Sequence, residues 1–162
     1  MSKVGHVIGT HALGNGGMDM AVRRAANAGM SAVQVFTAIP KFYGDKASIR
    51  TERVDKFRRA LVDTGIRPEH VLVHAAYVLN PASEDEVKWG RSAGELVKEM
   101  ERSHALGVGG VCFHPGSCPR TDPEPAAQRV AAAMAQALRA VQGATRLYVE
   151  NSAGAGNTFG KN

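Results

Sequence analysis

Short apolar segments of strand length alternate with longer segments of helical periodicity, and this alternation constrains the fold of the chain more than any other feature. The predicted strands lie at residues 6–11, 32–37, 71–77, 110–114 and 146–150. Each is a run of apolar and β-branched residues that is too short for a typical helix. Strands that alternate with helices pair in parallel through right-handed crossovers. The sequence therefore predicts an α/β fold with a parallel sheet.

Four helices are predicted between these strands, and the third carries the clearest signals. Ser83 and Glu86 have the spacing of a capping box, apolar residues recur at helical spacing from 93 to 100, and Gly107 follows as a C-cap. The sequence therefore predicts a long amphipathic helix between Ser83 and Gly107.

The other three helices are predicted from apolar spacing and from their ends. The first contains residues 21–26 and the second contains residues 54–62, while the fourth begins at a capping box of Thr121 and Glu124 and runs to Gly143. Five strands and four helices fit either an open, doubly wound sheet or part of a (β/α)₈ barrel, which usually takes about 250 residues. We expect the 162 residues to form a single domain.

Composition limits the compartment and the partners. The N-terminus has no charged start followed by an apolar run and a cleavage site, and no apolar run approaches the roughly 20 residues that span a bilayer. We therefore expect a soluble, cytoplasmic protein. Cys112 and Cys118 are spaced neither for a disulfide framework nor for a CxxC pair, so we expect one buried strand residue and one loop thiol.

The formal charge of +5 is concentrated between residues 41 and 59. Such a cluster attracts polyanions, although a charged stripe on a helix is also typical of a solvated face. The basic residues are Lys41, Lys46, Arg50, Arg53, Lys56, Arg58 and Arg59, and the acidic ones are Asp45, Glu52 and Asp55.

Residues that can bind metal stand at the ends of several predicted strands. His11, His114 and Glu150 each close a different predicted strand, and His74 lies with Tyr77 at the end of another. The ligand side of a parallel α/β fold is the carboxyl edge of its strands, and His74, His114 and Glu150 are separated by about one strand–helix unit each, so we expect them side by side. Neutral imidazole and carboxylate suit zinc or a similar divalent ion, and three protein ligands leave a position open for water or substrate.

Four segments of the sequence, in order, resemble the motifs of the endonuclease IV family of apurinic/apyrimidinic endonucleases. They are HVIGTHALGNGGM at 6–18, HAAYVLN at 74–80, FHPGS at 113–117 and ENSAGAG at 150–156. The corresponding family motifs are GAHVSxxGG, HxSYLIN, FHPGS and ENTAGxG. The resemblance covers essentially the whole chain.

The resemblance implies a xylose isomerase-like TIM barrel that acts in DNA repair. Members of this family use up to three zinc ions, with manganese or another divalent ion as a possible substitute, to hydrolyse the phosphodiester 5′ to an abasic site. His74 and His114 resemble ligands of one zinc, and Glu150 resembles the catalytic carboxylate that bridges this zinc to a second. His11 stands beside these ligands as a residue that could support them.

The resemblance also implies contacts with double-stranded DNA that contains abasic sites. Tyr77 and Val78 resemble an apolar pair that the family inserts into kinked DNA, and Lys41 matches an arginine of the family. The sequence departs from the family at 39–43, where IPKFY replaces the polar NQRQW or NPRxW. Lysine and arginine are not equivalent at such sites.

The family takes its remaining metal ligands from three further strands that the predicted elements do not include. We therefore expect about five strands and four helices of the eightfold barrel, and an isolated chain that is inactive or poorly stable unless it is completed. Two other functions stay open. One is a sugar isomerase or epimerase of the xylose isomerase-like barrel, and the other is a non-catalytic DNA-binding remnant.

Overall fold

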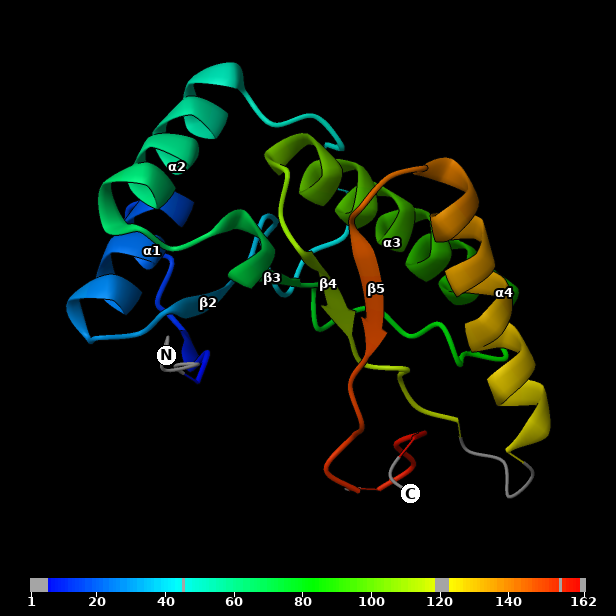
Figure 1. Cartoon of the computed structure of the whole chain (residues 1–162). Coiled ribbons are helices and arrows are strands. Elements are labelled where there is room, and N and C mark those ends of the chain that lie inside the picture. Colours follow the sequence, from blue (N-terminus) through cyan, green and yellow to red (C-terminus); the bar gives the residue numbers. More distant parts are fainter. Residues whose placement is uncertain (1–5, 45, 119–122, 155, 161–162) are drawn as a thin grey trace.

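A single parallel sheet forms the centre of the structure, which is a computed structural model. It describes residues 6–44, 46–118, 123–154 and 156–160. Its five strands follow the order β1-β2-β3-β4-β5, so each strand pairs with its neighbour in the sequence. The strands are β1 (Gly9–His11), β2 (Ala32–Val35), β3 (Val71–His74), β4 (Gly110–Phe113) and β5 (Arg146–Val149). Figure 1 shows their connections by helices.

The helices lie along one face of the curved sheet (Figure 1). They are α1 (Met18–Asn27), α2 (Thr51–Thr64), α3 (Glu86–Leu106) and α4 (Glu124–Ala140), and a short 3₁₀ helix, η1 (Pro68–His70), precedes β3. Sequential strand order with helices on one face is the arrangement of a (β/α)₈ barrel segment and not of a doubly wound sheet. The barrel expectation is confirmed. Among the described helices, none has both the length and the apolarity that crossing a membrane requires.

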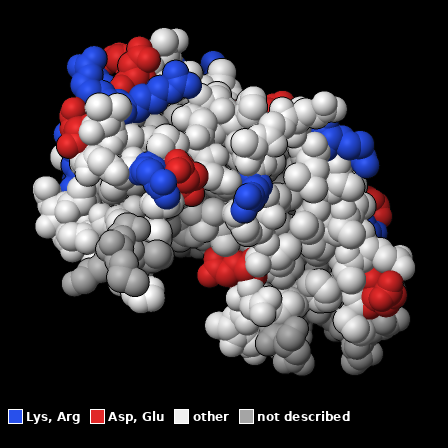
Figure 2. All heavy atoms as spheres, viewed as in Figure 1, with Lys and Arg blue, Asp and Glu red and all other residues white. Residues whose placement is uncertain are grey.

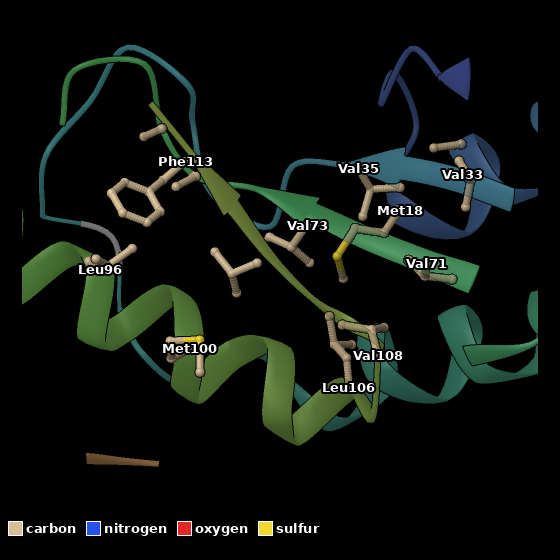
Figure 3. Packing of buried hydrophobic residues seen from close by; sticks show 14 of the residues in the cluster. Met18, Val33, Val35, Val71, Val73, Leu96, Met100, Leu106, Val108 and Phe113 are labelled. Atoms are coloured by element: carbon tan, nitrogen blue, oxygen red, sulfur yellow. The ribbon is translucent and has the colours of Figure 1, made fainter. Parts of the chain in front are cut away.

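The hydrophobic core lies between the sheet and these helices. Alternate side chains of the strands point toward it, because successive residues of a strand face opposite sides. Val33 and Val35 of β2 and Val71 and Val73 of β3 are almost fully buried. Figure 3 shows Leu96 and Met100 of α3 on the opposite side of this core from the strands. The other face of the sheet, which carries the predicted ligands, is free of helices (Figure 1).

All five predicted strands are longer than the observed ones, the last two by one residue each. The first pairs with β2 only from Gly9, the second ends at Val35, and the third ends at His74 where residues 71–77 were predicted. The Ala75 amide donates the last bond from this segment to β4, at the Cys112 carbonyl, and the next residues bond to loops: the Tyr77 amide donates to the Pro40 carbonyl. Apolar composition continues past these ends, and it does not mark where pairing stops.

The capping box predicted at Ser83 is wrong. Asp85 is the N-cap of α3, and its carboxylate accepts hydrogen bonds from the amides of Val87 and Lys88. The hydroxyl of Ser83 instead accepts from the amide of Asp85. A carboxylate at the N-terminus of a helix also interacts favourably with the helix dipole, which explains why Asp85 takes this position. The second predicted cap, Thr121, lies outside the described residues.

Candidate metal centre

The predicted ligands gather at the carboxyl edge of the sheet. His11 ends β1, His74 ends β3, and His114 and Glu150 follow β4 and β5 directly. The ring centroid of His74 lies 5.1 Å from that of His114 and 5.9 Å from that of His11. Parallel pairing in sequence order therefore brings the four residues to one edge, at the lower ends of β4 and β5 in Figure 1.

The contact between His74 and Glu150 is the centre of this group. Nδ1 of His74 lies 2.7 Å from the carbonyl oxygen of Ala75, to which it must donate, so the neutral ring carries its lone pair on Nε2. That Nε2 lies 3.2 Å from Oε2 of Glu150. Two acceptor atoms that face each other at this distance need a proton or a cation between them. The local geometry therefore fits a bound cation.

His114 offers a further nitrogen. Its Nδ1 is buried and has no hydrogen-bond partner within the part of the chain that the structure describes. A buried polar atom without a partner is unfavourable, and ligand binding is one of the few ways to satisfy it. The assignment of His114 as a metal ligand stays a prediction, and this nitrogen supports it.

Cys112 is a neighbour of Glu150 that the sequence reasoning missed. Its thiol donates a hydrogen bond to Oε2 of Glu150 across 3.3 Å. One donor atom each from His74, Cys112 and Glu150 lie within 4.8 Å of one another. The signal was present, because Cys112 precedes His114 by two residues and so faces the same side of β4. The expectation of one buried strand cysteine and one loop cysteine is confirmed, and the buried one adjoins the site.

The electrostatics of the group favour an ionised Glu150. Partial burial acts to raise the pKa of its carboxyl, but the Cys112 hydrogen bond and the positive charges that His114 and His74 carry when protonated outweigh burial, and the pKa is lowered. Burial and the adjacent carboxylate raise the pKa of the Cys112 thiol to about 12. Burial and the charge of a protonated His74 lower the pKa of His11, against a hydrogen bond from the His11 ring to Gln34, which raises it.

Hydrogen bonds between loops hold these donors in place. The side-chain amide of Asn80, after β3, donates to the Ser117 carbonyl across 3.1 Å, and its Oδ1 accepts from the Ser117 amide across 2.9 Å. The amide of Phe159, after β5, donates to the Gly116 carbonyl. A Cβ on Gly116, whose φ is +95°, would lie 2.0 Å from Oδ1 of Asn80. The loops that follow β3, β4 and β5 are therefore joined to one another.

The predicted DNA-binding residues lie at the rim of this group. Tyr77 is half-exposed, and its ring centroid lies 5.1 Å from that of His74. Val78 is half-buried, and its carbonyl accepts a hydrogen bond from the hydroxyl of Tyr43. Lys41 is exposed on the loop between β2 and α2. Their contact with DNA stays a prediction.

Much of the predicted basic cluster lies on α2, where acidic residues accompany it. Lys56 pairs with Glu52 at 2.7 Å, one helical turn apart. Figure 2 shows side chains of both signs gathered over α2, at the upper left. This part of the cluster resembles a solvated helix face more than a continuous basic surface.

Sequence comparison identifies relatives of the chain. A profile of the xylose isomerase-like TIM barrel matches residues 22–162. A protein of Chlorobium phaeobacteroides named probable endonuclease 4 is 32% identical over 153 residues, which is 94% of this chain and 54% of the relative. The corresponding protein of Chlorobium limicola is also 32% identical and is covered to 53%. The chain therefore spans about half the length of the curated relatives it matches.

Comparison with solved structures agrees with the sequence. Endonuclease IV from Thermus thermophilus superposes with a TM-score of 0.77 at 32% identity, covering 94% of this chain and 54% of that one. A D-tagatose 3-epimerase-like protein superposes with a TM-score of 0.68 at 14% identity, over 94% of this chain and 55% of that one, which shows a shared fold alone. The resemblance to endonuclease IV that the motifs predict is confirmed.

Proposed function

The chain belongs to the xylose isomerase-like TIM barrel family, and its relatives include proteins named probable endonuclease 4. We therefore propose that it is part of a zinc-dependent apurinic/apyrimidinic endonuclease that acts in DNA repair. The reaction is hydrolysis of the phosphodiester 5′ to an abasic site. The observation that carries the proposal is the pair of facing acceptors, His74 Nε2 and Glu150 Oε2, 3.2 Å apart. The unpartnered Nδ1 of His114 supports it.

The donor set fits a borderline ion such as zinc. His74, His114 and Glu150 would hold it through imidazole nitrogens and a carboxylate oxygen, which are ligands that zinc accepts in catalytic sites. When bound, clustered divalent ions neutralise the charge of a phosphodiester and lower the pKa of a bound water.

The protein's own contribution is to orient these donors. The Ala75 carbonyl keeps the proton of His74 on Nδ1, so that Nε2 faces the site. The Cys112 thiol donates to Glu150 and lowers the pKa of its carboxyl against the effect of burial, which favours the anionic form.

The DNA contacts in the proposal come from the rim. Tyr77 and Val78 would fill the space left by an extruded abasic nucleotide, and such apolar insertion stabilises kinked DNA. Lys41 would approach a phosphate. A DNA substrate of this kind also implies a cytoplasmic protein.

Neither alternative function has a specific observation in its favour. The epimerase relation rests on the shared fold at 14% identity. A non-catalytic DNA-binding remnant would retain DNA binding with well under one tightly bound zinc per chain. Metal analysis of the purified chain therefore separates the remnant from the enzyme.

A nicking assay on a duplex with a single abasic site tests the proposal. Because the chain spans about half the length of its relatives, the assay compares the chain alone with the chain mixed with the remaining part of the Chlorobium phaeobacteroides protein. We expect little incision by the chain alone and EDTA-sensitive incision by the mixture. We also expect Glu150→Gln to reduce this incision by at least about 100-fold.

Two results would overturn this proposal. One is a mixture that binds zinc and abasic duplex but does not incise it. The other is incision that survives EDTA or the Glu150→Gln substitution, because the proposed centre would then have no part in it.

A further inference from the structure

The segment Ile39–Pro40–Lys41–Phe42, where the sequence departs from its family, forms a tight turn at the rim of the candidate metal centre. The Phe42 amide donates to the Ile39 carbonyl across 3.1 Å, which closes a β-turn with proline at its second position. Proline is favoured there because its fixed φ suits the turn. The turn is therefore a defined structural unit of this chain.

Neighbouring elements anchor the turn on both sides. The Tyr77 amide donates to the Pro40 carbonyl across 2.8 Å. The Tyr43 hydroxyl donates to the Val78 carbonyl. The Gly44 amide donates to a carboxylate oxygen of Glu95 on α3, across 3.0 Å. These bonds tie the turn to the loop that carries the predicted DNA-inserting pair, and they hold it at a fixed position.

Apolar side chains on the turn, and the Tyr77 ring on the loop bonded to it, are exposed. Phe42 and Tyr77 are each 53% exposed, and Ile39 is 59% exposed. Single exposed apolar residues are common on protein surfaces, whereas a group of them beside a candidate site marks a place where something binds. The Tyr77 ring also continues into the site, since its centroid lies 5.1 Å from that of His74.

Cations lie on and beside the turn, and the carboxylate that anchors it, Glu95, is paired with Lys98 at 2.7 Å. Lys41 stands between Pro40 and Phe42 and forms no ion pair with a described residue. A groove of about 990 Å³ lies beside the turn, and the described residues that line it include Lys46, Arg50 and Arg53 but no acidic residue. None of these three cations forms an ion pair within the described part of the chain. The surroundings of the exposed rings therefore attract an anionic ligand.

Exposed aromatic rings interleaved with unpaired cations are typical of surfaces that bind unpaired nucleic acid strands. Each base can stack on a ring while the adjacent phosphate approaches a cation. In a fully stacked duplex the base faces are not accessible, so this mode of binding requires a base that has left the stack.

We infer that the turn is a nucleobase-binding rim, in which Phe42 stacks on an unpaired base and Lys41 contacts the adjacent phosphate. The inference rests on the proposed function in that the ligand is DNA, and it narrows the substrate class. It predicts a preference for abasic sites in single strands or beside unpaired bases over abasic sites in fully paired duplex.

Binding measurements in EDTA test the rim without any contribution from metal or turnover. Fluorescence anisotropy of labelled single-stranded and duplex DNA, each with one abasic site, gives the affinities of the chain at several salt concentrations. We expect Phe42→Ser to weaken single-strand binding roughly tenfold and duplex binding by about twofold, with an unchanged salt slope. Phe42→Trp should retain the affinity, because tryptophan also stacks on bases.

Two further variants separate stacking from charge and from general surface effects. Lys41→Gln should reduce the steepness of the salt dependence by about 0.7 on a single strand, as expected for one lost phosphate contact. Val62→Ser removes a side chain that is 82% exposed on α2, far from the turn in the sequence, and should leave both affinities unchanged.

The outcomes distinguish this inference from the proposed function. If Phe42→Ser weakens both DNA forms equally, or no more than Val62→Ser does, the rim is contradicted while the endonuclease proposal stands. If the unsubstituted chain binds neither form, DNA is not the ligand and both fail. A selective loss with Phe42→Ser that Phe42→Trp restores supports the rim.

Discussion

The central strands β3 and β4 and the outer strands β1 and β5 contribute to the candidate site in different ways. Every residue of β4 is buried, and β3 is buried except for one half-buried residue, whereas all of β1 is exposed and β5 is mostly exposed. His74 and His114 come from the central strands, while His11 and Glu150 come from the outer ones. The central donors are therefore positioned by the core and the outer ones by other means.

Different contacts position the donors of the two outer strands. The loop after β5 folds back onto the loop after β4, with Phe159 bonded to Gly116 and Cys118 bonded to Asn157. Glu150 is held by these bonds although its side chain is 46% exposed. His11 depends on ring contacts with Phe36 and His74, at centroid distances of 4.6 and 5.9 Å. The comparison indicates that the metal affinity and the stability of the fold are carried by separable parts of the molecule.

Removing the carboxylate of the outer strand should give the largest effect, and it should affect metal binding alone. Glu150→Gln keeps the shape but not the charge, and we expect zinc affinity to fall by at least about 100-fold. The free energy of unfolding without metal should change by less than about 0.5 kcal/mol, because the side chain is nearly half exposed and the amide of glutamine keeps its shape. Chelator competition and urea unfolding measure the two quantities.

Glu101→Gln is the matched control for this substitution, since Glu101 is an exposed glutamate on α3. It should change neither quantity. If Glu150→Gln destabilised the metal-free chain by about 2 kcal/mol or more, the conclusion that metal affinity and fold stability are carried by separable parts would be contradicted.

The bonds between loops can be broken at Gly116. An alanine there would place its Cβ 2.0 Å from Oδ1 of Asn80, at a φ of +95° that L residues rarely adopt. We expect Gly116→Ala to lower the free energy of unfolding by about 2 kcal/mol and the zinc affinity roughly tenfold, through displacement of the donors. Urea unfolding and chelator competition again give both values.

Gly94 provides a control on the same kind of change. It lies within α3, and a Cβ built there meets no atom within 4 Å. Gly94→Ala should stabilise the chain by about 0.5 to 1 kcal/mol, because alanine is the better helix former. A Gly116→Ala chain with unchanged zinc affinity would show that the loops do not position the donors.

Two valines test the difference between central and outer strands directly. Val73 of β3 is fully buried, and Val149 of β5 is 44% exposed. Val73→Ala should cost about 2 kcal/mol, from two buried methyl groups and the cavity they leave. Val149→Ala should cost less than about 0.5 kcal/mol. Equal losses in urea unfolding would mean that β5 is as well packed as β3.

The sequence predicts the order of elements well, because that order follows from periodicity. Five strands, four helices and their parallel pairing all come from alternating patterns, and the positions of His74, His114 and Glu150 at one edge follow from pairing in sequence order. The ends of the helices and strands are harder to predict from the sequence. Ser83 has the spacing of a cap, but Asp85 is the residue that bonds to the free amides.

Contacts between distant segments explain what the sequence reasoning missed. The two-residue spacing of Cys112 and His114 indicates the face on which Cys112 lies, but its bond to Glu150 depends on the register between β4 and β5. The bonds between Asn80 and Ser117 join motifs that lie far apart in the chain. Local patterns contain no information on such pairs. The bonds between Asn80 and Ser117 do explain why both residues belong to the motifs by which the family is identified.

The smallest effect concerns His11, whose pKa is lowered from 6.5 by burial and by the charge of His74. The folded chain therefore binds fewer protons than the unfolded chain as the pH falls below about 6.5, and the free energy of unfolding declines in that window. His11→Gln should reduce the decline. NMR titration of the metal-free chain should give a His11 midpoint below 6.5, and a midpoint at or above that value would contradict the coupling. Because burial is the larger cause and the charge of a protonated His74 the smaller, a lowered midpoint would show that His11 is partly desolvated beside His74 although it ends an exposed strand.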